Sequence, residues 1–391
     1  MHRQTLVIWG AGRIGRGFVA DLFTGAGYHA ILVDPAAPLV AQLRERGAYT
    51  VVSAAGENRR TDRVVRDFTA LATPEEDAIT DAVVEADLAA VAVFPQAFGG
   101  VAKQLAAGLI RRRSVRPGLP LDILLCTNLV HAGPLFRDAL EAALPPGAAS
   151  WTGAYAGIVE TLVIRMVVEP PADAVEADPL VVWTNGYAEF PVDRHAFRHG
   201  VPDLPFLRPV EDMRAEEMRK LYTYNTFHAA LAYLGALRGH ATIVACLADP
   251  AVRAGAEGVL RESGAVVQAA CGFDTVEMEA WMAGVIKQTH NPALRDTVAR
   301  YGADPARKLR RTDRLVAPLL LARDHGIPTP NLTRALAAAL RYAAPEDAGA
   351  RAVRQAIESL GLRAAIRELC ELTGAEEDLV TEIASAYAEM A

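Results

Sequence analysis

The chain has 391 residues, of which 51% are hydrophobic and 22% charged, so it is a folded protein too long for one ordinary hydrophobic core. Its net charge of −7 argues against a nucleic-acid backbone as partner, because such a partner needs a clustered basic surface. We therefore expect two domains and a small-molecule partner.

The N-terminal end and the cysteines indicate the compartment. The strand-like run Thr5–Trp9 begins too early to leave room for a signal peptide, and no run of about 18 uncharged apolar residues predicts a membrane span. The cysteines are widely scattered, without the spacing of a zinc site or a disulfide framework: Cys126, Cys246, Cys271 and Cys370. We expect a cytoplasmic protein without a metal.

Short apolar runs alternate with helical stretches in the first part of the chain. They read TLVIWG at 5–10, AILVD at 30–34, LAAVAVFP at 88–95 and LDILLC at 121–126, with a helix expected after the first run and more helix after the second. This rhythm predicts a parallel sheet built from βαβ units. Further strand-like pieces between 151 and 197 predict an extension of that sheet.

A change of composition marks a second domain. The segment HGVPDLPFLRP at 199–209 carries three prolines and a glycine, as a connection does. Beyond it, Ala, Leu, Glu and Arg dominate and apolar residues recur at helical spacing. The sequence thus predicts an α/β domain over 1–203 and an all-α domain over 204–391.

The motif GAGRIG follows the first strand and opens a helix. It matches G-x-G-x-x-G, in which Gly10 makes the turn, Gly12 lets a pyrophosphate approach and Gly15 packs against the strand. Asp34 ends the second strand, where a carboxylate holds ribose hydroxyls and repels the extra phosphate of NADP. We expect a Rossmann domain that binds NAD, with these cofactor-binding residues: Gly10, Ala11, Gly12, Arg13, Ile14, Gly15 and Asp34. The alternative is an ordinary glycine turn beside a solvated acid.

Residues 217–237 predict a buried helix that carries a polar stripe. With Lys220 as zero and about 100° per residue, Glu217 lies at about 60°, His228 at about 80° and Asn225 at about 140°. A desolvated lysine serves as a general base near neutral pH, and an asparagine stabilises an alkoxide. The alternative is a solvated helix start with hydrogen-bonded core residues behind it.

Lys220, Asn225 and His228 reproduce the K-x-x-x-x-N-x-x-H signature of the polyol-specific long-chain dehydrogenases, the mannitol dehydrogenase family, which the chain resembles. The blocks GAGRIGRGF, KLYTYNTFHAALAYLGALRGHATI and RKLRRTDRLVAPLLLARDHGIPTPNL are similar in particular to the branch that acts on mannitol 1-phosphate. The resemblance spans nearly the whole chain.

This resemblance implies an active site in the cleft between the two domains. Lys220 is then the general base, Asn225 and Asn128 stabilise the alkoxide, His228 contacts the reacting oxygen, and Glu217 relays the proton. The expected reaction interconverts a polyol phosphate and a ketose phosphate with NAD and no metal, mannitol 1-phosphate and fructose 6-phosphate being the first choice.

Two positions depart from the family pattern. Thr127 stands where an acid commonly precedes the asparagine, and Ile164 stands where an aspartate associated with substrate commonly precedes Arg165. These changes leave open a free polyol or a hexuronate as substrate. An oxidative decarboxylase or 2-hydroxyacid reductase on a similar plan, and a catalytically silent NAD-binding protein, are the alternatives from other classes.

Two further groups of residues have spacings typical of ligand sites. His195 and His199 have the spacing of a zinc pair on a helix, but no acid lies between them and their surroundings favour a loop. The basic run Arg307–Arg314 either grips a substrate phosphate or forms a solvated helix face.

Overall fold

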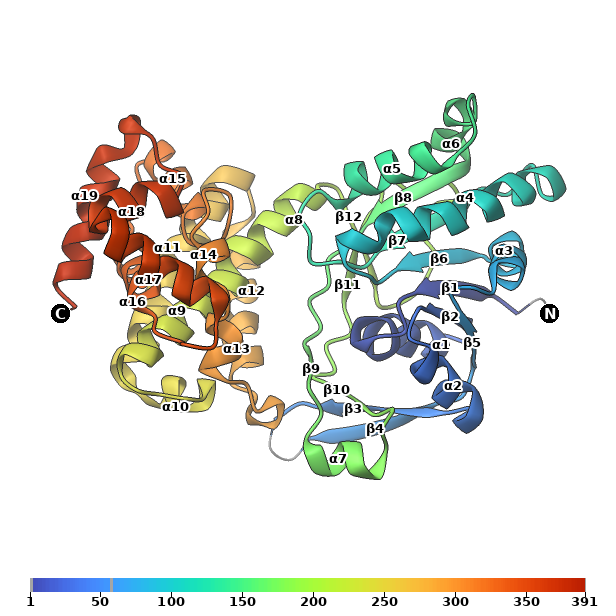
Figure 1. The fold of residues 1–391 in the computed structure, drawn as a ribbon, viewed down its shortest axis with the longest axis horizontal. Helices are drawn as coiled ribbons and strands as arrows, with labels where there is room; N and C mark the ends of the chain where they lie inside the picture. Colours follow the sequence, from blue (N-terminus) through green and yellow to red (C-terminus); the bar gives the residue numbers. More distant parts are fainter. Residues whose placement is uncertain (1–2, 57–58, 391) are drawn as a thin grey trace. The chain divides into compact units, whose positions relative to one another are not determined.

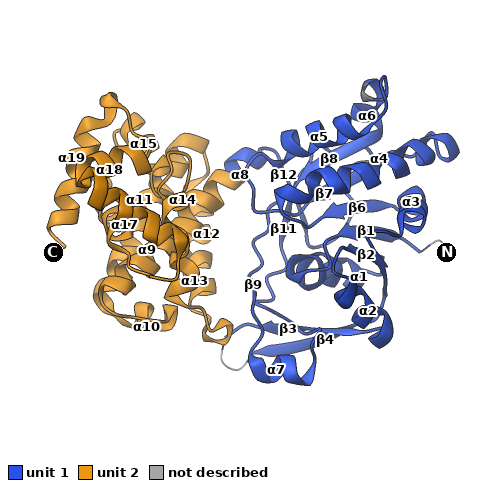
Figure 2. Ribbon diagram, viewed as in Figure 1, with its two compact units in different colours: residues 1–216 blue, residues 217–391 orange. Residues whose placement is uncertain are grey.

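The computed structural model describes residues 3–56 and 59–390. The chain divides into two compact units, residues 1–216 and 217–391, which Figure 2 shows in different colours. Each unit is described by itself below.

A six-stranded parallel sheet forms the centre of the first unit (Figure 1). Its order is β5-β2-β1-β6-β7-β8, and every neighbouring pair is parallel. The order reverses at β1, the arrangement of a Rossmann domain, in which ligands bind at the carboxyl ends of the strands beside that reversal. The strands are β1 (Thr5–Trp9), β2 (His29–Asp34), β5 (Phe68–Ala72), β6 (Leu88–Val91), β7 (Leu121–Leu125) and β8 (Ala156–Glu160). The predicted α/β fold is confirmed.

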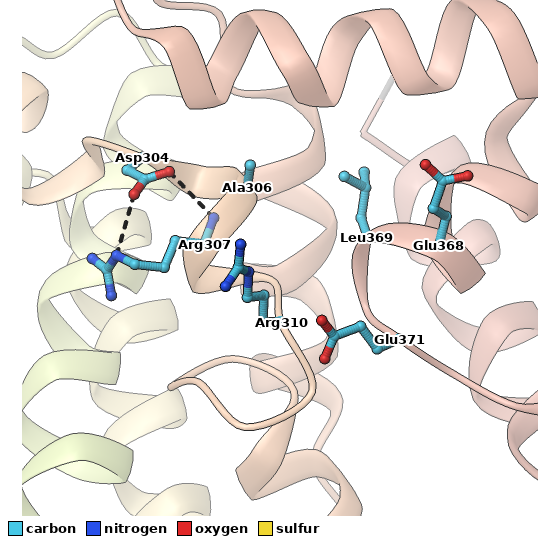
Figure 3. A pocket seen from close by; sticks show the side chains of 7 residues that line it. All are labelled: Asp304, Ala306, Arg307, Arg310, Glu368, Leu369 and Glu371. Carbon is cyan, nitrogen blue, oxygen red and sulfur yellow. Dashed lines mark hydrogen bonds and ion pairs between the residues drawn. The ribbon is translucent and has the colours of Figure 1, made fainter. Parts of the chain in front are cut away.

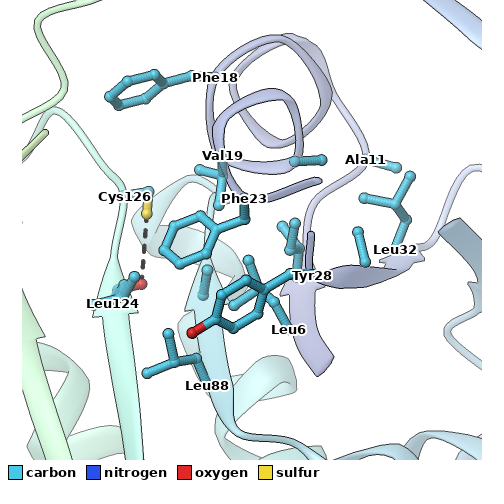
Figure 4. Close-up of a cluster of buried hydrophobic side chains, with 14 of the residues drawn as sticks. Leu6, Ala11, Phe18, Val19, Phe23, Tyr28, Leu32, Leu88, Leu124 and Cys126 are labelled. Carbon is cyan, nitrogen blue, oxygen red and sulfur yellow. Dashed lines mark hydrogen bonds between the residues drawn. The ribbon is translucent and has the colours of Figure 1, made fainter. Parts of the chain in front are cut away.

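Two hydrophobic cores cover the two faces of this sheet. One packs the sheet against α3 (Glu76–Glu85), α4 (Phe98–Val115) and α5 (Ala132–Ala143). The other, drawn in Figure 4, packs it against η1 (Gly15–Ala20) and α1 (Asp21–Gly25), with Phe18, Val19 and Phe23 in its centre. The strands are apolar on both faces because both are covered, as parallel sheets require.

Two smaller sheets complete the first unit. One, of order β4-β3-β10-β9, contains β3 (Tyr49–Ala54), β4 (Arg60–Val65), β9 (Val167–Val168) and β10 (Val182–Thr184); the other pairs β11 (Phe190–Asp193) with β12 (Leu207–Val210). Of the pieces assigned to an extension, β8 lengthens the main sheet, and the others form these two sheets. The expectation of helix between the second strand and β6 was wrong for β3, β4 and β5, which lie between α2 (Ala37–Arg46) and α3. The arginine-rich strand β4 is mostly exposed, so its sequence lacks an apolar signal.

The second unit is helical in its described residues; of the range predicted to be all-α, 204–391, the segment before this unit departs from the prediction by containing strand β12. Side chains of Asp249 and Asp274 cap α11 and α12 by accepting backbone N–H groups, and Gly272 ends α11 in the left-handed conformation. Its elements begin with the end of α8 (Met213–Arg219), η3 (Lys220–Tyr224), α9 (Asn225–Leu237), α10 (Ile243–Ala248), α11 (Pro250–Cys271), α12 (Thr275–Thr289) and η4 (Pro292–Leu294). They continue with α13 (Val298–Gly302), α14 (Pro305–Lys308), α15 (Ala317–Asp324), α16 (Pro330–Arg341), α17 (Ala348–Leu360), α18 (Leu362–Leu369), η5 (Gly374–Glu376) and α19 (Glu377–Ala388).

Among the described residues, no helix combines the length and the apolar character that crossing a membrane would demand.

Candidate active site

The glycine-rich loop leaves β1 at the point where the strand order reverses. A Cβ on Gly10, where φ is +98°, would stand 2.4 Å from the carbonyl oxygen of Ala92, and one on Gly15 would stand 1.8 Å from that of Gly10. A Cβ on Gly12 would meet nothing within 4 Å. The first and third glycines are therefore required by packing, whereas the space at Gly12 stays open for a ligand.

Asp34 joins this loop to the end of β2. Its Oδ2 accepts the backbone N–H of Ala11 at 2.7 Å, and its Oδ1 accepts that of Ala36 at 2.8 Å. The carboxylate is only 8% exposed, so these two donors compensate its burial. It stands beside the loop with acceptor capacity left for hydroxyl groups.

The other two loop residues that sequence reasoning singled out differ in their surroundings. Ile14 packs against the core beneath the loop, whereas Arg13 is exposed and its Nη1 pairs with Glu169 at 2.5 Å. Ile14 therefore anchors the loop, and the guanidinium of Arg13 is held at its outer side.

Asn128 follows β7 and is exposed, two residues after the buried Cys126. Because the carboxyl ends of parallel strands meet at one edge of a sheet, Asn128 shares an edge with the glycine-rich loop and Asp34. The first unit thus gathers the predicted cofactor residues and one predicted asparagine along that edge.

Lys220 is buried, only 9% exposed, at the start of η3 in the second unit. The pKa of its amine is lowered from 10.5 to about 8, chiefly by burial and also by the charge of Arg314, while Glu217 opposes both effects. Glu217 is itself buried, one helical turn before it. The amine can therefore gain and lose a proton near neutral pH.

The helix between Lys220 and Asn225 is a π-helical turn, not α-helix. The backbone N–H of Asn225 donates to the carbonyl oxygen of Lys220, a hydrogen bond across five residues. The offset of about 140° that ideal α-helix geometry gives these two residues is therefore wrong. Because a π turn holds about one more residue than an α-helical turn, it brings the direction of Asn225 closer to that of Lys220 than the α-helical offset.

His228 is held between two tyrosine rings. It stacks on Tyr301 with ring centroids 4.1 Å apart at 18°, and the centroid of Tyr224 is 4.5 Å away. Its Nε2 lies 3.0 Å from Oγ1 of Thr289, whose hydroxyl donates to the carbonyl of Val285 at 2.8 Å. The Thr289 oxygen therefore accepts from His228, which assigns the proton to Nε2 and leaves Nδ1 as an acceptor.

Positive charge surrounds this histidine. The pKa of His228 lies well below its usual range, chiefly because the ring is buried. Four cations lower it further: Arg300, Arg314, Lys308 and Lys220. The imidazole is consequently neutral at physiological pH, and the surrounding region favours an anionic group. Of the predicted site residues, the structure brings Lys220, Asn225, His228 and Glu217 together in the second unit, and Asn128 belongs to the first.

The basic run at 307–314 is not one continuous surface. Arg307 pairs with Asp304 and Asp313, and Arg311 pairs with Glu376. Lys308 is buried, and its Nζ donates to the carbonyls of Tyr301 and Ala303. The five side chains of the run therefore serve separate roles.

Arg310, which is exposed, borders a pocket of about 330 Å³ in the helical unit (Figure 3). Three carboxylates line the same pocket: Asp304, Glu368 and Glu371. A pocket of such mixed charge does not select a phosphate, and we assign it no part in the site.

Arg314 is the member of this run that acts on two predicted site residues of the second unit. The positive charge of Arg314 lowers the pKa of both Lys220 and His228. Its Nε donates to Asp313 at 2.8 Å. Neither this role nor that of Arg300 or Thr289 was predicted, because residues distant in the sequence carry no pattern that links them to Lys220.

The two positions that depart from the family pattern both lie in the first unit. Ile164 is buried in the first unit, and Arg165 after it is fixed by Asp21 and by the carbonyls of Gly17 and Tyr187. Thr127 is half-buried beside Asn128.

The two histidines with zinc-like spacing, His195 and His199, lie in a turn and a bend and not on a helix. His195 Nε2 instead contacts Glu211 at 3.0 Å. The spacing therefore does not place both rings on one face.

Comparison with known proteins covers both units. Residues 4–205 match the model of the mannitol dehydrogenase Rossmann domain, and residues 212–390 match that of the mannitol dehydrogenase C-terminal domain. Together the two models account for nearly all of the chain.

Two solved structures share the fold. The ternary complex of Pseudomonas fluorescens mannitol 2-dehydrogenase with NAD and D-mannitol is 18% identical, with a TM-score of 0.72, and the match covers 99% of this chain and 92% of that one. D-sorbitol dehydrogenase in substrate-free form is 16% identical, with a TM-score of 0.82, covering 98% of this chain and 92% of that one.

Proposed function

Because the chain belongs to the mannitol dehydrogenase family, we propose that it is an NAD-dependent oxidoreductase that interconverts a polyol phosphate and a ketose phosphate, mannitol 1-phosphate and fructose 6-phosphate first among them. Residues 1–203 bind the cofactor, and residues 204–391 supply the base and the substrate site. The observation that carries the proposal is a buried lysine beside an asparagine and a neutral histidine in cationic surroundings.

The first unit fits NAD. The open space at Gly12 admits a pyrophosphate against the backbone, at the start of the helix that runs through η1. Asp34 accepts ribose hydroxyls and repels a 2′-phosphate, and the following residues Pro35 and Ala36 supply no arginine for one. When bound, the nicotinamide accepts or gives the hydride.

The proton steps belong to the second unit. In the oxidation direction, Nζ of Lys220 takes the proton of the substrate hydroxyl, which its lowered pKa permits near pH 8. Asn225 and Asn128 donate amide N–H groups to the oxygen as negative charge develops there. Glu217 passes the proton on towards solvent. The amine supplies the base, so this chemistry requires no metal ion.

His228 acts as an acceptor. With Nε2–H donated to Thr289, its Nδ1 accepts a hydroxyl proton of the sugar chain and orients the carbon that reacts. This role needs a neutral imidazole, which the low pKa of His228 provides.

The proposal that the substrate carries a phosphate is based on the positive charge near His228. Arg300 and Arg314 both act on His228, and a dianion is the substrate group that such a field favours. A free polyol or hexuronate is the alternative, since Ile164 replaces the family's aspartate.

The test is a panel of purified substrates. Fructose 6-phosphate, free fructose, other ketose phosphates and hexuronates are each assayed with NADH, and kcat/KM is compared within pairs. We expect fructose 6-phosphate to exceed fructose by about 10²-fold or more, the range that one hydrogen-bonded group contributes. Equal values for the pair would exclude a phosphate-specific enzyme, and turnover of a 2-keto acid alone would favour the hydroxyacid reductase.

A further inference from the structure

Two consecutive hydrogen bonds connect α12 to the π-helical turn and to the residue before it. The indole Nε1–H of Trp281, on α12, donates to Oγ1 of Thr223 at 2.8 Å. The hydroxyl of Thr223 in turn donates to the carbonyl oxygen of Arg219, the residue immediately before Lys220. Thr223 is fully buried, so water does not replace either bond.

These contacts fix both ends of the turn. The guanidinium of Arg219 lies 4.4 Å from the ring centroid of Phe273 and 4.6 Å from that of Trp281, and it pairs with Glu277. Phe273 precedes α12, and Glu277 and Trp281 belong to it, so three residues of this segment contact the side chain of Arg219. Arg219 cannot shift along the helix without losing all of these contacts.

A π turn holds one more residue than an α-helical turn and is less stable on its own. Resting on the proposed role of Lys220 as base, we propose that Thr223 and Trp281 are positioning residues that stabilise the π-helical turn and thereby keep Lys220 and Asn225 on the same side of the helix. Neither residue touches substrate. Relaxation of the turn to α-helix would rotate the amine away from the amide and expose it to water.

The test begins with Thr223→Val, which keeps the shape of the side chain and removes its hydroxyl. We expect kcat to fall about 10-fold or more, because a small misplacement of reacting groups has an effect of this size, with the KM for NADH unchanged. Thr223→Ser restores the hydroxyl and should restore kcat. Trp281→Phe removes the donor to Thr223 and part of the ring that faces Arg219, and it should act in the same direction.

A second measurement does not depend on turnover. The reactivity of the Lys220 amine towards acetic anhydride, followed against pH by peptide mass spectrometry, reports its pKa directly. Arg314 and Glu217 are the charged groups acting on this amine. Both stay in place in Thr223→Val, so added exposure to water should raise the pKa by about half a unit or more.

Thr152→Val is the matched control. Thr152 is also fully buried and donates to the carbonyl four residues earlier, Ala148, at 3.0 Å, but it lies in the first unit. Its loss should lower the melting temperature and leave the Lys220 pKa and kcat unchanged. Thr223→Val with wild-type kcat and a wild-type Lys220 pKa would overturn the positioning role. A wild-type protein inactive on every substrate, with a labelling shift in Thr223→Val, would instead reject the proposed function alone.

Discussion

The backbone N–H of Asn225 donates to the carbonyl oxygen of Lys220, five residues before it. An α-helix would have paired Asn225 with Leu221 and placed the two side chains on diverging lines. The extra residue in the turn brings the proposed base and the proposed amide donor closer in direction, and these are the two groups that one alcohol oxygen needs at the same time.

Replacing the base should abolish turnover and leave the fold intact. Lys220→Met removes the amine but keeps the aliphatic stem, so we expect kcat to fall by about 10² or more with the Kd for NADH unchanged. The exposed Lys287 is the control, and Lys287→Met should behave as wild type. Near-normal turnover in Lys220→Met would reject the lysine as base.

The same variant should not lose stability at pH 7. The folded pKa of Lys220 is about 8 against 10.5 for an unburied lysine, so between these values the unfolded chain binds more protons and the free energy of unfolding rises with pH. At pH 7 the buried charge is unfavourable, and Lys220→Met should raise the free energy of unfolding by roughly 1–3 kcal/mol. Chemical denaturation at pH 7 and pH 10 measures this, and the gain should shrink at the higher pH.

The pH dependence of catalysis follows from the same amine. Oxidation needs Lys220 neutral, so kcat/KM should rise through a pKa of about 8, and in the reduction direction it should fall above that pH. Arg314 lowers this pKa and Glu217 raises it. In the pH profile of kcat/KM, the transition should therefore move to higher pH in Arg314→Met and to lower pH in Glu217→Gln. Movement of both variants in one direction would contradict this arrangement.

Arg314 also provides the sharpest test of the phosphate. Arg314→Met should raise the KM for fructose 6-phosphate by about 10-fold or more and change that for free fructose far less, since only the former carries a dianion. Arg310 belongs to the same basic run but borders the mixed-charge pocket, so Arg310→Met is the control and should leave the KM for both substrates unchanged. An equal rise in KM for both substrates would mean that Arg314 acts only through Lys220.

Cofactor choice should depend on Asp34. We expect kcat/KM with NADH to exceed that with NADPH by about 10² or more, and Asp34→Asn to narrow the ratio by removing the negative charge. The asparagine still offers an oxygen acceptor to the N–H of Ala11, so the loop should persist, which near-wild-type thermal stability would verify. Equal use of both cofactors by the wild-type chain would rule out this role.

The features that sequence reasoning predicted are local or periodic. The glycine spacing, the strand before it and Asp34 at the end of the next strand depend on neighbours in one βαβ unit, and they specify the sheet edge that they share. The helical character of the second unit follows from composition. The π turn could not be foreseen, because helix propensity does not encode where one residue is added.

Other parts of the site depend on contacts between distant residues. Thr226 Oγ1 donates to the carbonyl oxygen of Arg314, 88 residues later, at 2.8 Å, and this contact joins α9 to the segment before α15. No period links the two positions. Strand β4 was missed for a different reason: its pattern of exposed arginines is typical of a surface segment, and only pairing with β3 makes it a strand.

Asp34 has a consequence for the speed of cofactor binding. Since its carboxylate already fixes Ala11 before any dinucleotide arrives, the loop does not have to search for its bound shape during the encounter. Association should then be a single phase, first order in NADH, with a rate set by diffusion and orientation of the two molecules. Slow release of the product would in that case have to originate elsewhere in the protein than in the glycine-rich loop.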